Sequence, residues 1–249
     1  MERKYLYGII NTQASLCFAV NSKGVEVAVY TIHYQDLACL VSDTSSPVCD
    51  PLPENLLTHE KVLQAALQDY TVLPVRFGTI LKDRPAVEAF LAQNYFEIKQ
   101  VLADLTGKIE LGLKVIWKKD AFIREIEAAE PRIPELKKRI AERLPEECTG
   151  LRLQLGQLVA GVVEDRRRFY VRVIYEPLAE CAFLASLNPL AGERMVLNAA
   201  FLVEKEREAE FDRLVNRVCE KFEDRFDFKY TGPWAPSSFI TTLFTREGV

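Results

Sequence analysis

The sequence predicts an α+β protein made of two domains, the C-terminal one a modified ferredoxin-like α/β sandwich. Alternating apolar runs, typical of strands, are interleaved with segments of helical periodicity along the whole chain. The charged residues 119–148, punctuated by prolines, interrupt this pattern and are typical of a connection between domains. With 249 residues, the chain has the length of two domains. We therefore expect an N-terminal α+β domain over residues 1–130, followed by a helical connection and the ferredoxin-like domain over residues 131–249.

The first domain should open with strands. Residues 5–10 and 37–41 are short apolar runs, and residues 25–32 alternate between two apolar sets, which favours strands in all three places. Residues 45–53 are rich in Ser and Pro and predict a loop. A helix should follow, because Leu56, Leu63, Leu67 and Tyr70 fall on one face at helical spacing.

The second half of this domain contains a proline-bearing strand, a helix and a long alternating strand. Pro74 cannot donate a ladder hydrogen bond, so the strand at residues 73–77 should be an edge strand or begin at Pro74. Asp83 followed by Pro85 is a good helix start, and the helix should run to Gly107. Odd-numbered apolar residues from Ile109 to Trp117 then predict a half-buried strand.

The C-terminal part follows a regular order. A helix should begin near Leu151 and end at Pro177, and strands are predicted at residues 181–187 and 195–203, with a turn between them. An amphipathic helix carrying Phe211 and Phe222 follows, and residues 226–230 alternate as a final strand. This order of helix, strand, strand, helix, strand matches a ferredoxin-like unit that lacks its first strand.

Composition limits the functions open to this chain. The formal net charge of −4 argues against nucleic acid as a partner, because phosphate binding uses clustered positive charge. No stretch approaches the roughly twenty apolar residues of a membrane span, and no signal peptide is visible, so we expect a cytoplasmic protein. The six cysteines are scattered without a C-x-x-C pair, which predicts free thiols and no metal site.

No catalytic or cofactor-binding motif is present, so we predict no enzyme activity, no catalytic residue and no cofactor. The sequence has no nucleophile elbow, no phosphate-binding glycine loop and no dinucleotide fingerprint. The pair His59-Glu60 is the one helical set of titratable residues worth weighing. Glu60 lies on the apolar stripe of its helix, and a buried carboxylate is costly unless paired. We expect a structural ion pair between Glu60 and Arg76; a general-base role for His59 or Glu60 is the alternative.

Four segments carry a family resemblance: Tyr5-Leu6-Tyr7-Gly8-Ile9, Leu73-Pro74-Val75-Arg76-Phe77-Gly78-Thr79, Glu193-Arg194-Met195-Val196-Leu197-Asn198-Ala199-Ala200-Phe201-Leu202-Val203 and Thr231-Gly232-Pro233-Trp234-Ala235-Pro236-Ser237-Ser238-Phe239. Together they resemble the gas vesicle protein F/L family, whose members are accessory factors in building gas-filled protein organelles. The ending Ser237-Ser238-Phe239 departs from a Pro-Tyr-Ser-Phe-like ending expected there. The resemblance implies a non-enzymatic accessory or minor structural protein at the gas vesicle.

Its partners would be the major hydrophobic shell protein, or its nucleation complex, and other gas vesicle accessory proteins. Pairing onto a free sheet edge is a natural way to hold an apolar client, and both the Pro74 strand and the missing first strand suggest open edges. We therefore predict partner binding at Arg76, Phe77, Thr79 and Trp234. The alternatives are that these residues only pack their own domain, and that the protein is a small-molecule-sensing regulator or an enzyme of unknown chemistry.

Overall fold

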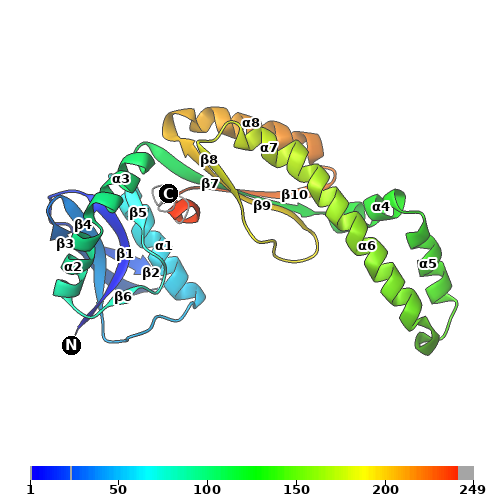
Figure 1. The fold of residues 1–249 in the computed structure, drawn as a ribbon, viewed down its shortest axis with the longest axis horizontal. Coiled ribbons are helices and arrows are strands. Elements are labelled where there is room, and N and C mark those ends of the chain that lie inside the picture. Colours follow the sequence, from blue (N-terminus) through cyan, green and yellow to red (C-terminus); the bar gives the residue numbers. More distant parts are fainter. Residues whose placement is uncertain (1, 23, 241–249) are drawn as a thin grey trace. The chain divides into compact units, whose positions relative to one another are not determined.

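The chain forms two compact units, and the computed structural model describes residues 2–22 and 24–240 (Figure 1). Unit 1 combines the residues up to Glu110 with residues 204–206 and the segment from Gly232 onward. Unit 2 holds residues 111–203 and 207–231. The predicted division at residue 130 is therefore corrected. The alternating strand near residue 110 leads into the second unit, and the C-terminal segment returns to the first.

Unit 1 is built on a mixed-length antiparallel sheet. Its strands are β1 (Arg3–Asn11), β2 (Cys17–Ser22), β3 (Val25–Tyr34), β4 (Leu37–Thr44), β5 (Val72–Pro74) and β6 (Ile80–Leu81). The order is β2-β3-β4-β1-β5, and β6 pairs with β1 beyond the end of β5. The predicted strands are present, whereas β2, which is short and ends in the polar residues Asn21 and Ser22, was not predicted.

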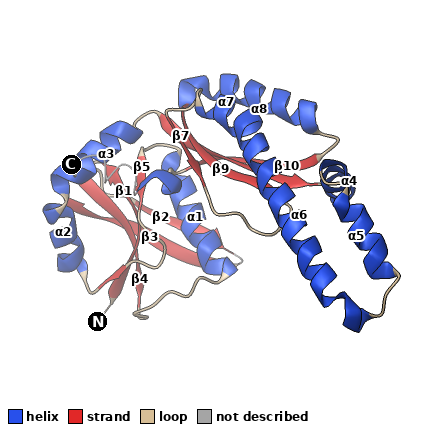
Figure 2. Cartoon of the chain, turned by 45° about the vertical axis from the view of Figure 1, so that its right-hand side comes forward, coloured by secondary structure: helices blue, strands red, loops and turns tan. Residues whose placement is uncertain are grey.

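Helices cover both faces of this sheet. These are α1 (Pro53–Leu67), α2 (Arg84–Gln93) and α3 (Tyr95–Leu105), with α1 on one face and α2 and α3 on the other (Figure 2). The central strand β1 is consequently buried on both faces over most of its length. Asp83 caps α2 as predicted, since its side chain accepts a 3.0 Å hydrogen bond from the Ala86 amide. The predicted single helix is divided at Asn94 into α2 and α3.

The strand β5 ends the order of this sheet, which confirms the edge position inferred from Pro74. Pro74 is the last residue of β5 rather than its first, and it faces Gly8 of β1. A side chain at Gly8 would collide with α1 and β5, because its Cβ would lie 3.0 Å from Leu63 and 2.9 Å from Val72. Glycine is thus required at the point where helix and strand approach β1 most closely.

Unit 2 is a ferredoxin-like fold with its first strand in place. The strands are β7 (Lys108–Trp117), β8 (Leu184–Leu187), β9 (Met195–Glu204) and β10 (Phe226–Trp234), arranged in the order β10-β7-β9-β8. In chain order within the unit this is fourth, first, third, second, the arrangement of a β-α-β-β-α-β fold. The prediction of a missing first strand is wrong, because β7 fills that place.

The first crossover of unit 2 is unusually long. It contains α4 (Lys119–Ala129), α5 (Arg132–Ala141), a 3₁₀ turn η1 (Pro145–Cys148), α6 (Thr149–Tyr170), a π-helical turn η2 (Val171–Tyr175) and α7 (Glu176–Ala179). The second crossover is the short turn η3 (Lys205–Arg207) and α8 (Glu208–Phe222). Across the described residues, no helix is long and apolar enough to span a membrane.

Candidate partner-binding site

The segment that follows β5 is tied to α1 by an aromatic cluster. Tyr5 and Tyr7 of β1, His59 of α1 and Phe77 lie together, with the His59 and Phe77 ring centroids 5.6 Å apart. The Tyr5 ring lies 5.7 Å from His59 and 6.2 Å from Phe77, in edge-on arrangements that aromatic rings favour. The large residues of two of the motifs found in the sequence therefore meet in one place.

Hydrogen bonds run through the same cluster. The Gly78 amide donates to the Tyr5 hydroxyl at 3.2 Å, and that hydroxyl lies 2.9 Å from Nδ1 of His59. His59 also makes a hydrogen bond to the backbone of Val75. Burial lowers the pKa of His59 to about 4, outweighing the effect of the Val75 bond. The neutral imidazole thus accepts from Tyr5 and holds α1 against the chain that leaves β5.

Residues 76–79 form a turn, which we call the 76–79 turn. The Arg76 carbonyl accepts the Thr79 hydroxyl at 2.7 Å and the Thr79 amide at 3.2 Å. Gly78 has a φ of +83°, in the left-handed region that favours glycine. The Arg76 side chain is exposed, whereas Phe77 and Thr79 are partly exposed. The three predicted residues are adjacent, and only Phe77 packs inward.

The predicted ion pair between Glu60 and Arg76 is not formed. Among the described residues no salt bridge joins them, and Arg76 extends to solvent. Glu60 is half-buried, and burial raises the pKa of its carboxyl group. The tie that Glu60 was expected to make between the helix and the Pro74 strand is made by its neighbour His59.

Trp234, the fourth predicted residue, lies in unit 1, where the C-terminal segment contacts α1 and the start of β7. Gln64 of α1 donates to the Pro233 carbonyl at 2.8 Å, and Ala235 joins the core cluster of this unit. Trp234 itself is partly exposed. Pro233 and Ala235, the neighbours of Trp234 in this motif, therefore fasten the segment to unit 1.

A buried carboxylate secures the end of this segment. Glu110 is 8% exposed and accepts two hydrogen bonds from Ser238, at 2.9 Å from its amide and 2.6 Å from its hydroxyl. Burial raises the pKa of Glu110, and the nearby Glu60 carboxylate acts in the same direction. Ser238 occupies the place of the serine in the Pro-Tyr-Ser-Phe-like ending, so the departure at Ser237 leaves both donors to Glu110 in place.

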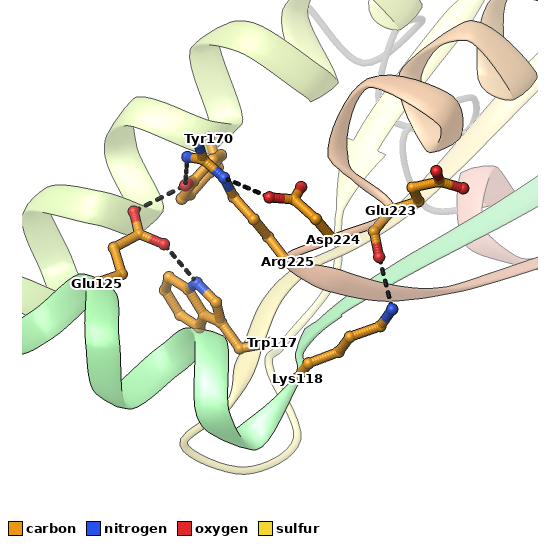
Figure 3. A network of polar contacts seen from close by, with 7 residues as sticks. All are labelled: Trp117, Lys118, Glu125, Tyr170, Glu223, Asp224 and Arg225. Atoms are coloured by element: carbon orange, nitrogen blue, oxygen red, sulfur yellow. Dashed lines mark hydrogen bonds and ion pairs between the residues drawn. The ribbon is translucent and has the colours of Figure 1, made fainter.

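Unit 2 contains a polar network that the sequence analysis did not find (Figure 3). The indole of Trp117 donates to one oxygen of Glu125 at 3.1 Å, and the Tyr170 hydroxyl donates to the other at 2.7 Å. Arg225 donates to the Tyr170 hydroxyl at 3.2 Å, and Arg166 lies 3.6 Å from Glu125. The network joins α4, α6 and the start of β10 to the end of β7.

The aromatic members of this network are core residues. Trp117 is fully buried and Tyr170 is 1% exposed, and both contact Phe226. Burial, with the bond to Glu125, raises the pKa of Tyr170 to about 12. A neutral phenol that donates to Glu125 and accepts from Arg225 satisfies all three groups, which is the arrangement of a structural anchor. The sequence signal for this network was Trp117 at the end of an alternating strand. It could not reveal the other members of the network, because they are distant in sequence.

No group of three His, Cys, Asp or Glu residues in the described part of the chain could hold a metal ion. All six cysteines are free thiols. His59 and Glu60, weighed as a catalytic pair, are used differently: His59 is 5% exposed and fully engaged within the protein.

The chain was compared with known proteins. The family model of the gas vesicle synthesis protein GvpL/GvpF matches residues 3–241. Gas vesicle protein F of Haloferax mediterranei is 25% identical, over 96% of this chain and 93% of its own length. Gas vesicle protein F of a Streptomyces species is 30% identical, over 82% of this chain and 84% of its own. The chain therefore belongs to the GvpL/GvpF family of gas vesicle proteins, as the four segments implied.

The fold also matches a solved structure. The crystal structure of gas vesicle protein GvpF from Microcystis aeruginosa aligns with a TM-score of 0.76 and 24% sequence identity, covering 96% of this chain and 98% of that one. This likeness supports the α+β architecture described above. Relatives named F and relatives named L both match the chain. The protein thus belongs to a family involved in gas vesicle formation.

Proposed function

We propose that this protein is a non-enzymatic accessory or minor structural protein that binds the hydrophobic shell protein, or its nucleation complex, during gas vesicle assembly. The observation that carries the proposal is the family match over residues 3–241. Other gas vesicle accessory proteins would be further partners. A very apolar client needs its strands covered before it assembles, and a protein surface that offers a sheet edge and apolar side chains can do this without chemistry.

The proposed contact surface consists of the end of β5 and the 76–79 turn. We add Trp234 because it belongs to another of the segments that carry the family resemblance. Its support is that β5 is an edge strand, that Arg76 is exposed, and that Phe77, Thr79 and Trp234 are partly exposed. All four residues belong to unit 1. The second open edge once expected from a missing strand in unit 2 no longer contributes, since β7 occupies that position.

The test is capture of the major shell protein by the tagged full-length chain after co-expression. We expect wild type to retain it, and Arg76→Ala, Phe77→Ser and Trp234→Ala to retain several-fold less while keeping the wild-type circular dichroism spectrum. Arg84→Ala is the matched control, because Arg84 is an exposed arginine of the same unit, 56% exposed in its side chain. Capture by none of the proteins would reject the function, and equal capture by all would reject only this surface.

A further inference from the structure

A cavity of about 690 Å³ opens on the α1 face of the sheet of unit 1. Its floor includes Tyr5 and Tyr7 of β1 and Ser42 of β4, and its rim is the loop between β4 and α1, including Asp50, with the first turn of α1. The cavity borders the 76–79 turn, because a Cβ on Gly78 would lie 3.7 Å from the carbonyl of Cys49 in the cavity wall.

The floor is aromatic and its polar groups are already paired. Tyr5 and Tyr7 are 6% and 4% exposed, with ring centroids 4.8 Å apart. The Tyr7 hydroxyl lies 2.9 Å from the Ser42 hydroxyl, and the Tyr5 hydroxyl serves His59. The floor therefore has no unmet hydrogen bond to offer an occupant, and recognition falls to the groups of the rim.

The rim is acidic without compensation. Three carboxylates line the cavity, those of Asp43, Asp50 and Glu54, and none of the described lining residues is Lys, Arg or His. Asp43 is paired with Lys4 and accepts the Tyr30 hydroxyl at 2.8 Å. In the described part of the chain neither Asp50 nor Glu54 has a salt bridge, which leaves two negative charges at the mouth. An occupant that brings a positive charge is favoured there.

Exposed aliphatic side chains stand next to these carboxylates. Val48 of the rim is 65% exposed, Leu52 is 48% exposed, and Leu56 and Leu57 are 42% and 41% exposed. Leu56 was predicted to lie on the buried face of α1 with Leu63, but near the N-terminal end of the helix it is exposed. Exposed leucines close together leave apolar surface in contact with water, which a bound partner would cover. The occupant should therefore carry apolar side chains next to its positive charge.

We propose that this cavity receives an arginine side chain from an apolar segment of the shell protein. The guanidinium would bind the carboxylates of Asp50 and Glu54, while aliphatic neighbours of that arginine cover Val48 and Leu52. Arginine fits better than lysine because its planar group can bind carboxylates through two parallel hydrogen bonds. The inference rests on the proposed function and adds the chemistry of the segment that is recognised.

The first test uses the full-length chain and a pair of short acetylated Leu/Arg peptides, identical except that citrulline replaces arginine in one. Citrulline keeps the shape and removes the charge. Tyrosine fluorescence and isothermal titration should show that wild type binds the arginine peptide about fivefold more tightly than the citrulline peptide. Equal binding of the two peptides, or binding of neither, would overturn the proposal.

The second test uses the double variant Asp50→Asn/Glu54→Gln, which removes the two uncompensated charges at exposed positions. Its matched control is Glu146→Gln/Glu147→Gln, which removes two exposed glutamates from η1 in unit 2. We expect the rim variant to capture about fivefold less shell protein than the control and to lose the preference for the arginine peptide. Equal capture by both variants overturns the inference while wild-type capture still upholds the proposed function. No capture by wild type rejects the proposed function, and the partner named here with it.

Discussion

At the scale of single residues, one neutral histidine joins α1, β1 and the chain beyond β5. His59 accepts from Tyr5, bonds the backbone of Val75 and packs against Phe77. A proton on Nδ1 would remove the acceptor that the Tyr5 hydroxyl uses, and a charge would be buried without a carboxylate partner. This explains why two conspicuous motifs and one helix residue are found at the same place in unit 1.

This residue gives a pH-dependent stability with a defined sign. The pKa of His59 falls from an ordinary 6.5 to about 4 on folding, so only the unfolded chain takes up the proton between these values. Its contribution is fully present above about pH 6.5 and is lost as the pH falls toward 4. Between pH 7 and 4 we expect wild type to lose on the order of 3 kcal/mol more unfolding free energy than His59→Gln.

Urea unfolding of both proteins across this pH range measures that difference. The comparison with His59→Gln is needed because Glu60 and Glu110 have raised pKa values, and their contribution has the opposite sign. Parallel pH profiles for the two proteins would show that His59 is not held neutral by the fold.

The sequence predicted that Glu60 would join α1 to the Pro74 strand, whereas its neighbour His59 does so. Leucine spacing placed Glu60 on the buried stripe, but α1 buries His59, Val62, Leu63 and Ala66 and leaves Leu56, near its N-terminal end, exposed. Leu52 before the helix and Leu57 within it are exposed as well, so the apolar periodicity marked a partly exposed surface. Residue types alone cannot distinguish a leucine that faces the core from one that a partner covers.

At the scale of elements, the ferredoxin-like unit is completed by a strand far away in sequence. The alternation in β7 was predicted correctly, but α4, α5, α6 and α7 separate it from β8, so it was assigned to the preceding domain. Short connections are the usual guide to which elements belong together, and this crossover departs from that guide. What fixes β7 to its helices is the network around Glu125, whose members come from four elements.

Glu125→Ala should destabilise unit 2 by about 1–3 kcal/mol, because the buried donors of Trp117 and Tyr170 would lose their acceptor. The control is Glu127→Ala on the same helix. Glu127 forms an exposed pair with Lys137 at 2.7 Å, and removing such a pair changes stability by about 0–1 kcal/mol. Thermal unfolding followed by tryptophan fluorescence compares them. If the two variants melt together, the Glu125 network is not an anchor of the unit.

At the scale of the whole molecule, the chain crosses between its units more than once. The C-terminal segment returns to unit 1, where Glu110 holds Ser238 and Ala235 enters the core. Composition and proline content indicated two units and roughly where they change. They could not indicate the return. It depends on a buried glutamate in β7 and on two donors of a single serine, Ser238, more than a hundred residues later.

Taken as a whole, unit 1 is where the proposed contacts gather: the 76–79 turn, Trp234, and the cavity with its acidic rim. The described residues of this unit offer exposed apolar and charged side chains around a floor whose own polar groups are satisfied. Such a surface is suited to hold a partner without transforming it. We therefore propose that this protein shields the shell protein before assembly.

The most direct measurement is the amount of shell protein that stays in the supernatant after ultracentrifugation, with and without an equimolar amount of this chain. Shell protein made in a cell-free system with the chain present should remain in the supernatant in a complex that contains both proteins. With the chain absent, or with Asp50→Asn/Glu54→Gln in its place, more of it should sediment. If the shell protein sediments to the same extent with the wild-type chain as without it, this protein does not shield the shell protein.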